Sequence, residues 1–89
     1  MADFEKRGSE IRSQAKALVL EYMRASSDCS PGSEGIRQAQ IFRDCGFDWG
    51  NYESAPSTQQ DYWVVALLRE LEFEGKIERV RKSGPWRLL

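Results

Sequence analysis

The sequence predicts an α+β domain in which three helices precede a C-terminal β-hairpin. Three observations lead to this class. Residues 58–74 combine a broad apolar arc with a helix start after Pro56 and a stop at Gly75. Two earlier segments repeat apolar residues at three- and four-residue steps. Beyond Gly75 the pattern changes to two short strand-like runs around Lys82-Ser83-Gly84-Pro85.

The helix expected over 58–74 carries the widest apolar arc in the chain. Ser57 and Gln60 fit a capping box, in which the side chain of each residue accepts a hydrogen bond from the backbone N–H of the other. The predicted buried arc consists of Val64, Val65, Leu67, Leu68 and Leu71. The opposite side is short of charge, with Gln59, Tyr62, Ala66 and Phe73 at its centre and Trp63 and Arg69 at its flanks.

Two further helices are expected before it. The first spans about 9–25, with a core face made by Ile11, Ala15, Leu18 and Tyr22, and with Val19 and Met23 as further candidates. A Ser-, Asp-, Pro- and Gly-rich loop at 26–35 separates it from a shorter helix near 36–45 that buries Ile41, Phe42 and Cys45 and stops at Gly46. Residues 1–8 lack this periodicity and are expected to be a flexible N-terminus, so the single domain covers residues 9–89.

The connection at 47–56 is longer than most helix–helix loops and contains three aromatic residues. One interpretation makes it a lid in which Phe47 and Trp49 cover the core. The other makes it a contact loop beside the entry to the last helix. Both remain open from the sequence.

The register of the hairpin decides where its arginines point. A two-residue Ser83-Gly84 turn would mix charged and apolar side chains on each face. A three-residue Lys82-Ser83-Gly84 loop sets Val80 opposite Trp86 and sorts the two faces, so we expect this register. The outer surface would then hold Arg79, Arg81 and Arg87, spaced as in a ribbon that follows a phosphate backbone, while Ile77 departs from the alternation.

Charge is uneven along the chain. Residues 76–89 hold five basic side chains and one acidic one, which leaves eight basic and thirteen acidic side chains for residues 1–75. A basic hairpin on an acidic body indicates an anionic partner. Alternatively, Lys and Arg on short exposed strands discourage edge-to-edge pairing.

Composition is that of an ordinary globule of one domain, with 40% apolar and 30% charged residues. No apolar run approaches the roughly 20 residues that a membrane span needs, so no membrane partner is expected. The first residues also lack the apolar stretch of a signal peptide. The expected location is the cytoplasm.

Enzymatic function is not expected, and no catalytic residue is assigned. The chain has no His, which removes the commonest general base and the commonest metal ligand. Cys29 and Cys45 stand alone, so neither a metal site nor a redox motif is indicated; Cys45 is expected in the core and Cys29 as an exposed thiol in its loop. No Gly-rich phosphate loop is present. We therefore expect no cofactor and no small-molecule substrate.

Three helices followed by a hairpin, joined by the segment LLRELEFEGKIER at 67–79 and closed by Trp86-Arg87-Leu88, resemble the winged helix-turn-helix domains of transcription regulators. The resemblance covers residues 9–89. It implies a non-enzymatic protein that binds duplex DNA, with the third helix in the major groove and the hairpin, or wing, on the phosphate backbone. A small transcription regulator acting as a dimer would fit.

On these residues, the resemblance assigns the DNA contacts to two groups. The first lies on the third helix and consists of Ser57, Thr58, Gln59, Tyr62, Ala66 and Arg69, with Gln59 as the best reader of an adenine edge. Ser57 and Thr58, with the free amides of the helix start, would hold a phosphate. The second group lies on the wing and consists of Arg79, Arg81, Lys82 and Arg87.

A second interpretation keeps the fold but changes the partner. The proposed reading surface offers one Arg and no Lys, whereas DNA binders draw much of their affinity from phosphate contacts. Tyr62, Trp63 and Phe73 would instead suit a protein-docking or homodimer interface, because aromatic residues concentrate at interface centres. The two functions are compatible in a DNA-binding dimer.

Overall fold

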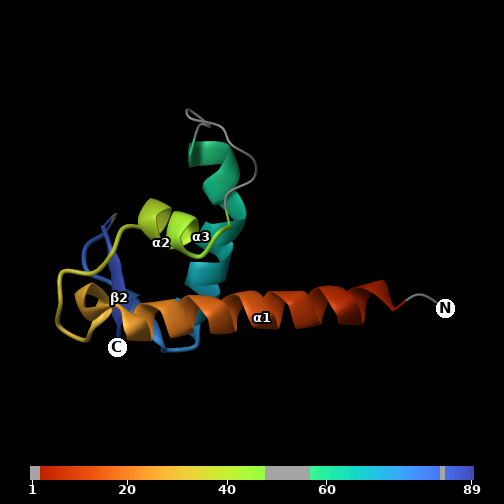
Figure 1. Cartoon of the computed structure of the whole chain (residues 1–89), viewed down its shortest axis with the longest axis horizontal. Coiled ribbons are helices and arrows are strands. Elements are labelled where there is room, and N and C mark those ends of the chain that lie inside the picture. The colour runs from red at the N-terminus through yellow and green to blue at the C-terminus, as the bar shows by residue number, and fades with distance from the viewer. Residues whose placement is uncertain (1–2, 48–56, 83) are drawn as a thin grey trace.

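The computed structural model describes residues 3–47, 57–82 and 84–89, with only the backbone described at 57–62. The elements in this part of the chain are α1 (Phe4–Ala25), the short 3-10 helix η1 (Ser27–Cys29), α2 (Gln38–Asp44), α3 (Ser57–Phe73), β1 (Ile77–Arg79) and β2 (Trp86–Leu88). Three helices and a two-stranded antiparallel sheet confirm the α+β class. In Figure 1, α3 crosses α1, α2 lies against α3, and the strands lie at the C-terminal end of α1.

The helix ends follow local signals. After α2, Gly46 has a φ of 72°, and Phe47 N–H donates to Phe42 O at 3.0 Å. After α3, Gly75 has a φ of 77°, and Lys76 N–H donates to Leu71 O at 3.1 Å. Both ends are therefore closed by a left-handed glycine with a bond back across the last turn. The two expected glycine stops are confirmed.

The first helix is longer than expected, because it begins at Phe4 rather than near Ser9. Its first turn is anchored by Arg7 N–H, which donates to Asp3 O at 3.1 Å, and Glu5 is favourably placed near the positive end of the helix dipole. Gly8 costs about 1 kcal/mol relative to Ala but does not end the helix. Flexibility of residues 1–8 stays a prediction. Along the described ranges, no helix is both long and apolar enough to cross a membrane.

The core lies where the three helices and the sheet meet. It consists of Val19, Leu20, Met23, Cys29, Ile41, Phe42, Val64, Leu67, Leu68, Leu71, Ile77 and Trp86. The apolar arc expected for α3 is confirmed at four of its five positions, with Val65 half-buried. Ile41 and Phe42 are buried as expected, and Cys45 is half-buried.

The expected core face of α1 is wrong at Ile11 and Leu18. Ile11 is 67% exposed and Leu18 is 40% exposed, whereas Val19, Leu20 and Met23 are buried. Ala15 and Tyr22 contact the edge of the core. Ile11 is exposed because the N-terminal half of α1 projects beyond α3 (Figure 1). Leu18 lies in the half that covers the body, but on the side of the helix turned away from Leu20 and Met23.

The expected hairpin register is also wrong. Arg79 pairs with Trp86, Glu78 with Arg87 and Ile77 with Leu88, rather than Val80 with Trp86. The pairing continues through Val80 N–H, which donates to Pro85 O at 2.8 Å. In an antiparallel sheet, opposed residues share a face, so one face holds Ile77, Arg79, Trp86 and Leu88. Ile77 thus obeys the alternation, and a four-residue tip at 81–84 closes the hairpin.

A bridge outside the named strands fixes the hairpin to the rest of the domain. Ile36 N–H donates to Trp86 O at 2.8 Å, and Trp86 N–H donates to Ile36 O at 2.9 Å. Strand β2 is therefore bonded on both edges. Gly35 makes this approach possible, since a Cβ on Gly35 would lie 2.6 Å from Trp86 O and its φ is 81°.

Replacing Gly35 by Ala should lower the free energy of unfolding through two effects. The left-handed φ costs about 1–2 kcal/mol in any non-glycine residue, and overpacking against Trp86 O adds about 1–3 kcal/mol. Gly32→Ala is a matched control, because Gly32 has the same φ of 81° but nothing lies within 4 Å of its added Cβ. Denaturant unfolding of both variants measures the difference. Equal losses in the two variants would contradict the close approach.

Candidate functional site

The expected reading surface lies on the first four turns of α3. Ser57, Thr58, Gln59 and Tyr62 fall within this helix, but their side chains lie outside the described part of the structure. Ala66 and Arg69 are exposed as expected. Arg69 Nη1 lies 3.1 Å from Glu72 Oε1, so its charge is partly compensated by a neighbour on the same helix.

Arg79 does not lie on the outer surface of the wing. Its guanidinium carbon lies 4.7 Å from the centre of the buried Trp86 ring, a cation–π arrangement. Its Nη1 donates to Lys82 O at 2.9 Å, which braces the tip of the hairpin. Its Nε and the Trp86 Nε1 are both buried and have no hydrogen-bond partner. Arg79 therefore supports the tip from the inner face.

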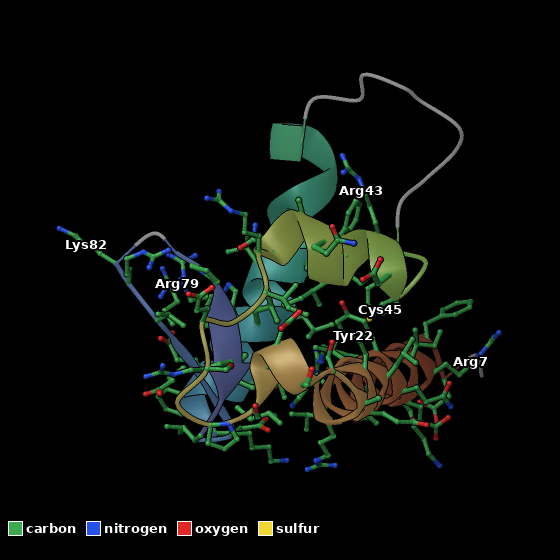
Figure 2. All side chains as sticks on the ribbon, turned by 60° about the vertical axis from the view of Figure 1, so that its left-hand side comes forward. Arg7, Tyr22, Arg43, Cys45, Arg79 and Lys82 are labelled. Atoms are coloured by element: carbon green, nitrogen blue, oxygen red, sulfur yellow. The ribbon has the colours of Figure 1, made fainter. Side chains whose placement is uncertain are left out.

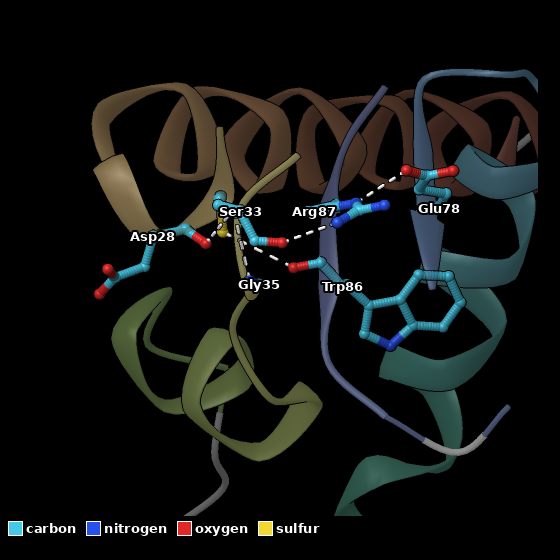
Figure 3. A network of polar contacts seen from close by, with 7 residues as sticks. Asp28, Ser33, Gly35, Glu78, Trp86 and Arg87 are labelled. Carbon is cyan, nitrogen blue, oxygen red and sulfur yellow. Dashed lines mark hydrogen bonds and ion pairs between the residues drawn. The ribbon is translucent and has the colours of Figure 1, made fainter. Parts of the chain in front are cut away.

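Arg87 lies on the other face of the hairpin, and its side chain is also engaged in hydrogen bonds within the domain. Its Nε donates to Glu78 Oε2 at 2.7 Å and its Nη1 to Ser33 O at 2.8 Å (Figure 3). The side chain thus joins both strands to the loop before α2. The expected surface shared by Arg79, Arg81 and Arg87 is not formed, because the actual register places Arg79 and Arg87 on opposite faces.

The exposed cations of the wing are at its tip. Arg81 and Lys82 are both exposed, and within the described residues neither makes a salt bridge. The tip is a turn in which Gly84 N–H donates to Arg81 O at 3.1 Å. A Cβ on Gly84 would lie 3.0 Å from Arg81 Cβ, so the turn holds this side chain close.

Sequence reasoning missed two further exposed cations. Arg37 directly precedes α2, and Arg43 lies in its last turn. Figure 2 places Arg43, Arg79 and Lys82 on one side of α1, together with α2 and the N-terminal turns of α3. The signal was present in the sequence. Arg37 and Arg43 flank the apolar pair Ile41 and Phe42, and charged residues beside a short buried face point to solvent.

The aromatic residues proposed for a protein interface do not form one patch. Trp63 is 37% exposed and its ring centre lies 4.7 Å from that of Phe47, while Phe73 is 92% exposed. The two are ten positions apart on α3, which separates them by about 15 Å along the helix. The side chain of Tyr62 and the whole of 48–56, including Trp49, lie outside the described residues.

Trp63 instead borders a groove between α1 and α3. This groove has a volume of about 350 Å³ and is lined by Gly8, Ile11, Arg12, Ala15, Trp63, Ala66, Leu67 and Glu70. Lys16 closes its far end, because its Nζ lies 2.9 Å from Glu70 Oε1 and also contacts Glu74. These partners raise the pKa of Lys16, and Lys16 lowers the pKa of Glu74. The charges therefore hold α1 against the C-terminal half of α3.

The thiols are poor nucleophiles. Cys29 is fully buried rather than exposed, because the loop folds back under β2, and its Sγ lies 3.9 Å from Trp86 O. Burial raises the pKa of Cys29, and burial with the nearby Asp44 raises the pKa of Cys45 to about 11. Both cysteines are free. Among the residues that the structure describes, no three His, Cys, Asp or Glu side chains gather as a metal site would require.

These groups predict a loss of stability at alkaline pH. The raised pKa of Cys29, Cys45 and Tyr22, the last from burial and its bond to Asp44, means that the unfolded chain releases these protons first. Their contribution is complete below about pH 9 and declines as the pH rises further. Urea unfolding followed by circular dichroism from pH 8 to 11 should show this decline.

The matched variant for this measurement is Cys45→Ala. It should unfold with a shallower dependence on pH between 9 and 11, because it lacks the thiol whose pKa rises from 9.0 to about 11. An identical pH dependence in the variant and the parent would show that Cys45 ionises alike in the folded and unfolded chains.

The described residues thus present two surfaces of different character. One is basic and lies at the tip of the hairpin, and the other is the apolar groove between α1 and α3. No family model matches the sequence, and no match is found among curated proteins or solved structures.

Proposed function

We propose that this chain is a winged helix-turn-helix domain that binds duplex DNA without catalysing a reaction. The order of the elements supports this proposal. A strand-like bridge at Ile36 lies between α1 and α2, α3 follows, and an antiparallel hairpin bonded to Ile36 closes the chain. In such a domain the third helix enters the major groove and the hairpin follows the adjacent backbone.

The observation that carries the proposal is that two cations of the hairpin stabilise its structure, while two others are exposed at its tip. Arg79 and Arg87 hold the hairpin together, through Trp86 and through Glu78. Arg81 and Lys82 are exposed at the tip and have no acidic partner among the described residues. Phosphate contacts therefore belong to the tip rather than to a ribbon along the strands.

The role of α3 follows from its position. Its N-terminal turns stand clear of α1 and of the strands (Figure 1), and Ser57, Thr58, Gln59 and Tyr62 belong to these turns. Base contacts are assigned to Gln59, whose amide can donate to and accept from an adenine edge. Arg69 is less suited, because it already pairs with Glu72.

Arg43 and Arg37 extend the basic surface onto α2. Figure 2 shows Arg43 on the same side of α1 as Lys82. The hairpin lies on the left of this view, and α2 lies to its right. Cations on both sides of α3 would contact phosphates on both sides of one groove. Binding of this kind depends steeply on salt, because each neutralised phosphate releases counterions.

The proposal predicts a measurable loss on removing the tip cations. Arg81→Ala combined with Lys82→Ala should weaken binding to labelled duplexes of mixed sequence, and should reduce the slope of log K against log salt by about 1.8, since each phosphate contact contributes about 0.9. Fluorescence anisotropy between about 50 and 200 mM salt measures both quantities. Folding should persist, because both side chains are exposed.

The control is Lys6→Ala combined with Arg24→Ala, which removes the same charge from exposed positions on α1. This variant should keep the salt dependence of the parent. The proposal fails if the parent shows no salt-dependent binding, or if removing the tip cations changes binding no more than the control does.

A further inference from the structure

A row of large apolar side chains is exposed along α1. Phe4 is 72% exposed, Ile11 is 67% exposed and Leu18 is 40% exposed. They are spaced seven residues apart, so they lie on one side of the helix over two heptads. Exposed apolar residues are common singly, but an aligned row on a projecting helix indicates an interaction surface.

The residues between them complete a seam. Gly8, Ala15 and Tyr22 follow Phe4, Ile11 and Leu18 at four-residue steps, which produces the alternating four–three spacing of a two-helix contact. The seam runs directly into the groove between α1 and α3, because Gly8, Ile11 and Ala15 line that groove. A second helix laid along α1 would therefore also contact Trp63 and Ala66 of α3.

We propose that a second copy of this chain occupies the seam, with the two α1 helices antiparallel. In this orientation, Ile11 of one copy lies opposite Ala15 of the other, and Leu18 lies opposite Gly8. The two inner large side chains, Ile11 and Leu18, then each meet a small one, as close packing requires, and Phe4 lies opposite Tyr22 at either end. A parallel pair would instead oppose Gly8 to Gly8 and Ala15 to Ala15, which leaves gaps. The inference concerns assembly alone and does not depend on DNA binding.

The charges beside the seam favour the same orientation. Arg7 and Glu21 lie on the flank away from α3, are both exposed, and make no salt bridge among the described residues. When Ile11 opposes Ala15, Arg7 of each copy lies beside Glu21 of the other, so symmetry forms the pair twice. Figure 2 shows Arg7 at the projecting end of the helix, where a partner can reach it.

The other flank is consistent with this arrangement. The two copies of Arg12 approach each other there, and Glu70 of each α3, which also pairs with Lys16, lines the same groove. In a parallel pair, Arg7 of each copy would instead meet Arg12 of the other, so like charges would meet on both flanks. Like charges at such positions oppose association.

The first test is sedimentation equilibrium of the protein without DNA. The parent should be a reversible dimer, and Phe4→Ser combined with Ile11→Ser should raise its dissociation constant by at least about tenfold, as expected for central apolar contacts. Circular dichroism should show a folded domain, because both side chains lie outside the core. A monomeric parent, or a dimer that this variant does not weaken, would overturn the proposal.

The second test uses charge reversal and leaves the apolar seam intact. Arg7→Glu and Glu21→Arg should each weaken the dimer by about threefold to tenfold, because each creates two like-charge contacts. The combined Arg7→Glu, Glu21→Arg variant should recover the affinity of the parent, since the pairs are restored in reverse. Failure of the combined variant to recover would exclude the antiparallel orientation. DNA binding by the tip variants is measured in a separate experiment. The dimer proposal and the DNA-binding proposal can therefore be contradicted independently of each other.

Discussion

The fold depends on the position of Trp86. Its ring is fully buried, its backbone bonds to Ile36 on one edge of β2, and its neighbours pair with β1 on the other. Figure 3 shows the polar contacts that converge beside it, from Gly35 and Ser33 to Arg87 and Glu78. The loop before α2, the hairpin and the core therefore meet at one residue. A change there would affect all three together.

This constraint explains why a hairpin rich in cations offers only part of them to solvent. Because Trp86 occupies the inner face, the residue opposite it is favoured if it is apolar or places a cation over the ring, and Arg79 does the latter. Arg87, on the outer face, lies within reach of Ser33, which the Ile36 bridge brings close. Only Arg81 and Lys82, beyond the last paired residues, escape these requirements.

Features set by local chemistry could be predicted from the sequence, and those set by tertiary contacts could not. The glycine stops at Gly46 and Gly75 need only a left-handed residue and its bonds. The hairpin register instead follows from the Ile36 bridge and the Arg79–Trp86 contact, which join residues far apart in the chain. The prediction of the core face of α1 was wrong for a related reason. Periodicity identifies an apolar stripe on a helix but not which part of the domain packs against it. The exposed tip cations could be predicted, but the roles of Arg79 and Arg87 could not.

The two proposed surfaces would reinforce each other. The seam runs along α1, whereas the tip of the hairpin lies away from that helix, so a partner on the seam leaves Arg81 and Lys82 uncovered (Figure 1). Pairing would also place two hairpin tips on one particle, and the second tip would then bind the same duplex as an intramolecular event. A domain with few exposed cations per copy could in this way reach useful affinity, because the number of phosphate contacts doubles while the number of contacts per chain stays small.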